Sequence, residues 1–362
     1  MATRRKVNSL RTRGRAEVAI GVSVTLVVFV AGLLWAKWMP YAAKAAKADR
    51  THHWSGSNVL TVGGVHAGDA PTWHAAATFF HAYVLSIWQA LVVALLISAS
   101  IQAFMPRSWL PRALNRRRLL SSGLAGGVAG MPSMMCTCCA APVAVTLRRN
   151  GVSPASAVAF WLGNPMLNPA VLVFLFLVAP WQWTLTRTVV GLVTVLAVAV
   201  SVGLVARTRA GPQPPLEMNA AVVGETTAAG LAAPRRFVRA LLRLCLILLP
   251  EYLVMVLVIG ALRGWLLTLS QPAHRGLLVV VLAAIAGTLI VIPTAGEIPI
   301  LQGLALLGVS SGTLGALLIT LPAVSAPGAA MVARSFGWKA IATATFVVIM
   351  AGLLGAAVLS LL

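Results

Sequence analysis

The chain has 362 residues, of which 59% are hydrophobic and only 10% are charged, and its formal net charge is +21. This balance excludes a soluble globular domain, and several apolar runs reach the roughly 20 residues that cross a bilayer. The basic residues fall in short clusters between apolar runs, as in cytoplasmic loops, which argues against nucleic acid as a partner. We therefore predict an all-α polytopic membrane protein whose main surroundings are the lipid bilayer.

The N-terminal region, residues 1–77, combines a basic tail, one apolar run and a polar stretch. A basic start before an apolar run occurs in signal peptides and in membrane anchors. The run at about 17–38 is long for a signal peptide and ends in two tryptophans, which favours an anchor with its N-terminus inside. We expect the polar stretch at 39–76 to be a loose loop outside. Its histidines match no metal motif, so a solvated loop is favoured over a metal site: His52, His53, His66 and His74, with His81 just beyond.

In the next region, residues 78–206, the number of apolar segments does not agree with the side of the membrane that the charges indicate. Five arginines follow its first apolar segment, and the arginine- and proline-rich linker at 207–239 follows its last one. Both clusters indicate cytoplasmic ends, yet three apolar segments separate them, at about 119–147, 152–179 and 185–206. Three full crossings would place the linker outside, so one segment must return to the side on which it entered.

The segment at 119–149 is the natural candidate for this return. Pro132 and Pro142 interrupt it, and a proline inside a helix removes a backbone donor and breaks or kinks the helix. Irregular backbone at membrane depth survives only where it is buried in protein or lines a cavity. We therefore predict a re-entrant helical hairpin with its tip near the bilayer midplane.

The last region, residues 240–362, repeats the first at an offset of 157. The tripeptide Gly-Val-Ser at 151–153 recurs at 308–310, and the prolines at 142 and 165 recur at 299 and 322. An odd number of crossings in each half would place the second half upside down. We predict two inverted repeats, each with one span, one re-entrant hairpin and two further spans, after an extra N-terminal span. Such repeats with broken helices are typical of secondary transporters.

The tip of the first hairpin concentrates sulfur. Cys136, Cys138 and Cys139 lie within four residues, beside three methionines that either extend the site or merely fill space. Thiolates select soft metals and metalloids such as trivalent arsenic, Cu(I) or Zn(II). The start of a returning helix would also favour the thiolate form. Cysteine is often just a small buried residue, but three in four residues favour a ligand or redox role.

Three further residues are candidates for substrate contact. The register places Glu297 at the tip of the second hairpin, about 276–306, opposite the thiols. A carboxylate at membrane depth is costly and indicates function, here a coupling proton or a cation contact, although a local cap would also explain it. Asn164 and Asn168 each precede a proline in the following span, where they either line the pathway or accompany a kink.

These motifs resemble those of a known family. The run from Cys136 to Pro142 is similar to the Cys-x-Cys-Gly-x-x-Pro signature of the predicted permeases that include the ArsP-type organoarsenical efflux permeases. The stretches at 148–151 and 160–169 are similar to further family motifs, and the likeness covers about 78–361. It implies a polytopic permease of the prokaryotic cytoplasmic membrane, with Cys136 and Cys138 as its thiol pair. Cys139 stands where the family usually has glycine, which leaves room for Cu(I) or another soft cation.

We expect an efflux permease for a soft metalloid or metal, which is not an enzyme and needs no cofactor. No nucleotide-binding loop or hydrolase motif is present in the sequence. The alternative is a membrane thiol–disulfide oxidoreductase, which adjacent cysteines would suit but which places reactive cysteines at a membrane surface. A third interpretation is a subunit that anchors a partner protein. The sequence leaves open the substrate, the energy source and whether the chain forms a homo-oligomer.

Overall fold

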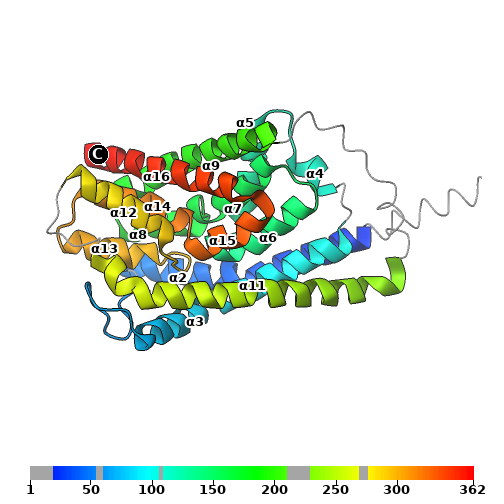
Figure 1. The fold of residues 1–362 in the computed structure, drawn as a ribbon, viewed down its shortest axis with the longest axis horizontal. Coiled ribbons are helices and arrows are strands. Elements are labelled where there is room, and N and C mark those ends of the chain that lie inside the picture. Colours follow the sequence, from blue (N-terminus) through cyan, green and yellow to red (C-terminus); the bar gives the residue numbers. More distant parts are fainter. Residues whose placement is uncertain (1–18, 54–59, 106–108, 210–228, 269–275) are drawn as a thin grey trace, which may run out of the picture.

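The computed structural model describes residues 19–53, 60–105, 109–209, 229–268 and 276–362. Within these ranges every regular element is helical (Figure 1). Five of the described helices are long and apolar enough to cross a membrane, and a bent pair of helices adds a sixth. An all-helical membrane protein is thereby confirmed. The basic tail before residue 19 and most of the predicted linker, 210–228, lie outside the described residues.

The helices follow the predicted apolar runs. The N-terminal helix starts at Ala19 and reaches Thr51; its second part consists of η1 (Leu34–Trp38) and α2 (Met39–Thr51). The rest of the first half contains α3 (Trp73–Phe104), α4 (Trp109–Leu114), α5 (Leu119–Gly130), η2 (Met131–Ser133), α6 (Thr137–Arg149), α7 (Pro154–Met166), α8 (Pro169–Val178) and α9 (Trp181–Arg209). The second half contains α11 (Ala229–Thr268), α12 (Leu277–Leu289), α13 (Glu297–Leu306), α14 (Ser311–Ala323), α15 (Ala326–Phe336) and α16 (Trp338–Leu361).

The N-terminal helix is longer than expected. We expected a loop from residue 39, but the helix continues through α2 to Thr51. Alanine and lysine, which dominate this stretch, are strong helix formers, so the helix continues beyond its apolar part. Tyr41 also packs edge-on against Phe174 of α8, with ring centroids 5.7 Å apart. The loop therefore begins only after His52, which ends the helix in the left-handed conformation.

Helices α5 and α6 form a hairpin. They have 12 and 13 residues, which at 1.5 Å per residue is about half the thickness of a bilayer core each. The chain before the hairpin contacts the chain after it, because the side chain of Asn115 donates to the carbonyl of Gly151 and accepts from the amide of Ser153. The chain thus returns to where it began. Pro142 is not part of the break, which lies between Gly130 and Thr137, but sits inside α6.

Local geometry recurs between the two halves at the predicted offset. Gly151 and Gly308 both have positive φ, at 84° and 78°. The residue after each glycine donates to a carbonyl five residues back, and the serine after that caps the next helix. The halves are not identical, because α7 and α8 together form one span whereas α14 and α15 are bent by 50°.

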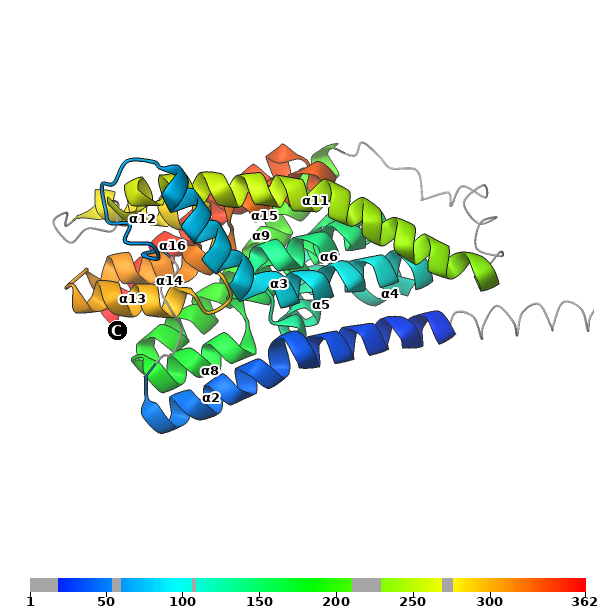
Figure 2. The same cartoon turned by 90° about the horizontal axis from the view of Figure 1, so that it is seen from below.

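Long helices from the two halves pair with one another. Helix α3 packs along α11, and α9 packs along α16. Figures 1 and 2 place these two pairs on opposite sides of the molecule, with α6, α7, α14 and α15 between them. The break before α6 is largely buried at Ser133, Met135 and Cys136, as irregular backbone at membrane depth requires, whereas Pro132 is exposed.

Close packing of α5 on α7 depends on Gly126. A Cβ added there would lie 2.0 Å from the carbonyl oxygen of Ser156, whereas a Cβ on Gly303 of α13 would meet nothing within 4 Å. Small residues let membrane helices approach closely. We expect Gly126→Ala to destabilise the fold by about 1–3 kcal/mol through overpacking. Gly303→Ala should be neutral or slightly stabilising, since alanine favours helix. Equal melting temperatures of the two variants in detergent would contradict this prediction.

Candidate functional site

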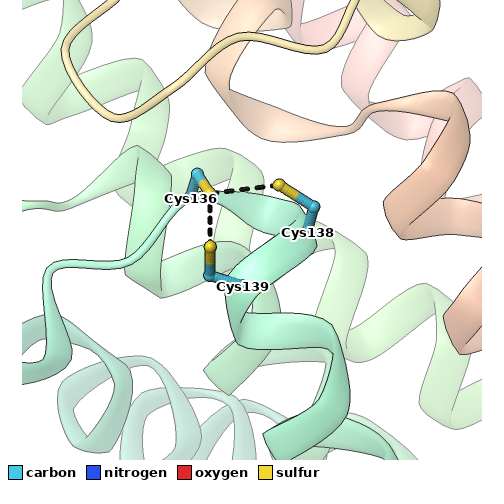
Figure 3. Close-up of side chains that lie close together, drawn as sticks. All are labelled: Cys136, Cys138 and Cys139. Carbon is cyan, nitrogen blue, oxygen red and sulfur yellow. Dashed lines mark hydrogen bonds between the residues drawn. The ribbon is translucent and has the colours of Figure 1, made fainter. Parts of the chain in front are cut away.

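The three cysteines lie together where the break gives way to α6 (Figure 3). All three are buried and free, and the Sγ atom of Cys136 is 3.1 Å from the Sγ atoms of Cys138 and Cys139. All three sulfurs lie within 4.8 Å of one another. Two sulfurs that bind one ion at about 2.3 Å are at most about 4.6 Å apart, so small shifts would let these sulfurs share an ion. The described histidines form no comparable group of three.

Two tyrosines contact the cluster from the paired helices α3 and α11. The hydroxyl of Tyr83 is 3.1 Å from the Sγ atom of Cys138, and that of Tyr252 is 3.6 Å from it. Both side chains are buried, and their rings lie 6.2 Å apart. Their hydroxyls offer the sulfur two hydrogen-bond donors in otherwise apolar surroundings. Neither tyrosine was predicted from the sequence, since an isolated tyrosine in an apolar span carries no local motif.

Asn164 holds the backbone of the first tip. Its Oδ1 atom accepts hydrogen bonds from the hydroxyl of Ser133 and from the amide of Met135, and its Nδ2 atom donates to the carbonyl of Phe160. It therefore contacts the segment that carries the cysteines rather than the sulfurs. Asn168 does something different: its Oδ1 atom caps the start of α8. The two asparagines, which we predicted together, thus have separate surroundings.

Glu297, at the start of α13, is buried against an arginine. Its Oε1 atom lies 2.8 Å from the Nη1 atom of Arg187 in α9. Arg187 also donates to the carbonyl of Pro165 at 2.7 Å and, over longer distances, to those of Met166 and Leu318. Arg187 was not predicted from the sequence. A lone arginine in an apolar run was the available signal, because such a charge normally has a partner inside the protein.

A cavity of about 10 Å³ separates the two tips. This space is about enough for one water molecule. Cys136 and Thr137 line it from the first tip, and Thr294 and Glu297 line it from the second. The remaining lining is apolar and comes from the second tip and from α7, α8 and α14: Ile292, Pro293, Ala295, Pro165, Val171, Leu321 and Pro322. A thiol and a carboxylate from opposite tips therefore line the same small cavity.

Lys37 was also missed by the sequence analysis. It lies between two tryptophans at the end of an apolar run, where a lysine ordinarily reaches the membrane surface. Instead its side chain is buried, and its Nζ atom donates to the hydroxyl of Tyr41 at 2.9 Å and to that of Thr294 at 3.1 Å. The N-terminal helix therefore places an amine beside the second tip.

Comparison with known proteins matches residues 72–361 to ArsP_1, a family described as a predicted permease. The chain belongs to this family. The match confirms the resemblance that the cysteine motif suggested, and it indicates a membrane transporter. A relative of this ArsP_1 protein is the UPF0718 protein YraQ of Escherichia coli strain K12, which is 42% identical over 316 residues. The aligned part covers 87% of this chain and 88% of that protein. No solved structure matches. Lys37 lies before the part that the family match covers.

Proposed function

We propose that this ArsP_1 protein is an efflux permease of the prokaryotic cytoplasmic membrane that binds a soft metalloid or metal at Cys136, Cys138 and Cys139. The observation that carries the proposal is the cluster of three buried thiols on a broken hairpin within a predicted permease. Thiolates select soft species such as trivalent organoarsenicals and Cu(I). Export of such species would give the cell resistance to them.

The transport cycle that we propose uses two inverted repeats with the N-terminus inside. Its support is the recurrence of the turn after α6, at Gly151, in the turn after α13, at Gly308, and the pairing of α3 with α11 and of α9 with α16. Rocking of one repeat against the other would open the cavity between the tips to alternate sides of the membrane. Asn164 would keep the thiol-bearing tip in shape, and Asn168 would keep the break before α8 in place during this movement.

Glu297 is where we propose that a proton acts. Its carboxylate joins the second tip to Arg187 of α9 through the 2.8 Å ion pair. Protonation would cancel the negative charge and weaken this contact, which would link the state of the second tip to the proton gradient. Release of protons from the thiols on substrate binding would also link transport to the proton gradient.

Transport into everted membrane vesicles tests the proposed function. We expect uptake of methylarsenite or Cu(I) by the native chain, and loss of this uptake in Cys136→Ser/Cys138→Ser. Cys245→Ser is the matched control, because Cys245 lies on α11 outside the cluster. Uptake that is absent from the native chain, or that survives in the double variant, would contradict the proposal. Rapid disulfide formation in the cluster without any uptake would instead favour the membrane thiol–disulfide oxidoreductase.

A further inference from the structure

A single turn of the N-terminal helix touches both hairpin tips. Lys37 donates to Thr294 of the second tip at 3.1 Å, and Thr294 lines the cavity that Cys136 also lines. The next residue, Trp38, donates from its Nε1 atom to the carbonyl of Pro132 in the first tip at 2.8 Å. A helix outside the family-matched region thus makes a hydrogen bond to each tip.

The turn that presents these two residues is a π-helix. It runs from Leu34 to Trp38, between α-helical segments on both sides. Short π-helical turns inside α-helices are rare and occur frequently at functional sites. Contact with both tips and the unusual backbone are separate observations, and both point to Lys37 and Trp38.

The charge of Lys37 has no carboxylate partner among the described side chains. Glu297, the acidic residue of the cavity, is already paired with Arg187. Thr294, which accepts from Lys37, lines the same cavity as Cys136, whose thiol is the other group of that lining that can carry a negative charge. A cation inside a membrane protein needs an opposite charge nearby. The anion that this site offers is a thiolate.

We propose that Lys37 is the counter-charge of the bound cargo and makes the site selective for a soft cation whose thiolate complex is anionic, foremost Cu(I). This inference rests on the proposed function of the thiols. When Cu(I) binds two of the thiols, two Cu–S bonds form, two S–H bonds break, and both protons pass to water. The resulting copper dithiolate carries one negative charge, which the ammonium of Lys37 balances.

A trivalent organoarsenical changes this balance. When an arsenical with two hydroxyl groups binds the same two thiols, two As–S bonds form, and the two As–O bonds and two S–H bonds break. The oxygens leave as two water molecules, and the resulting arsenic dithiolate is neutral. The ammonium of Lys37 would then have no counter-charge. Zn(II) on three thiolates would also balance Lys37, but zinc prefers four ligands and the cluster supplies three.

Binding to the purified full-length protein under reducing conditions tests this selectivity. Cu(I) affinity is measured by competition with a chromophoric chelator, and methylarsenite affinity by calorimetry. We expect Lys37→Met to weaken Cu(I) binding by roughly 30-fold or more, as for loss of one partner of a buried charge pair. Methylarsenite binding should stay within a few-fold of the native value. Lys47→Met, which removes an exposed lysine from the same helix, is the matched control and should change neither.

Each outcome decides between the two proposals. Selective loss of Cu(I) affinity in Lys37→Met, with methylarsenite binding retained as a measure of correct folding, supports the role of Lys37. Equal loss of both ligands, or native Cu(I) affinity in Lys37→Met, overturns it. If the role of Lys37 is overturned in this way, loss of binding in Cys136→Ser/Cys138→Ser would still support the thiol site. Absence of any thiol-dependent binding by the native protein overturns both proposals.

Discussion

Replacing Glu297 with glutamine should destabilise the protein by about 3–5 kcal/mol, because a buried charge would lose its partner. The Nη1 atom of Arg187 lies 2.8 Å from the carboxylate, and both side chains are buried. The variant should therefore unfold at a clearly lower temperature in detergent. Arg149→Met, which removes an exposed arginine from the end of α6, is the control and should change stability by no more than about 0.5 kcal/mol.

Removing both partners separates support of the fold from transport. Replacement of a buried ion pair by apolar residues is often close to neutral. Arg187→Met/Glu297→Gln should therefore recover most of the stability, although the carbonyl of Pro165 loses its donor. If the carboxylate takes part in proton coupling, this stable variant will not transport. Active transport by the double variant would show that the pair only supports the fold.

Asn164→Ala should have the second large effect. It leaves the amide of Met135 without its acceptor in the interior, at a cost of about 1–3 kcal/mol, whereas the hydroxyl of Ser133 loses one of its two acceptors and keeps the carbonyl of Gly130. Because these groups belong to the first tip, its cysteines should also react faster with an alkylating reagent. Alkylation of the tip peptide, followed by mass spectrometry, measures this loosening directly.

Asn168→Ala is the natural comparison, because it removes the same side chain four residues further on. Asn168 caps α8 and does not touch the tip, so its loss should cost about 1 kcal/mol. It should leave the alkylation rate of the cysteines unchanged. If the two variants loosened the tip equally, the assignment of Asn164 as the residue that holds it would be wrong.

Sequence patterns predicted the break before α6 because its cause is local: it follows from Pro132 and its neighbours. The turn at Gly308 matches the turn at Gly151 because the sequence repeats there. The same reasoning misjudged Pro142, which α6 accommodates inside its helix. It also ended the N-terminal helix too early, since hydropathy marks where the apolar run stops and not where helix-forming residues stop.

Four residues around the thiols were not predicted, and the reason is different. Lys37, Tyr83, Arg187 and Tyr252 each stand alone in an apolar helix, and each finds its partner far away in the chain. Spacing along one helix cannot reveal such a partner, because helix packing alone decides it. The chemistry of the thiols was therefore readable from the sequence, whereas the charges and hydroxyls around them were not.

The size of the cavity between the tips bears on how fast cargo can pass. With room for about one water molecule, this conformation admits no ion that keeps its hydration shell. A metal must exchange its ligands for the sulfurs one at a time, and the reverse exchange must free it on the far side. Transport that is limited by this exchange saturates with the concentration of the cargo and moves one cargo ion at a time. We therefore expect voltage-clamped bilayers that contain the protein to show no single-channel currents.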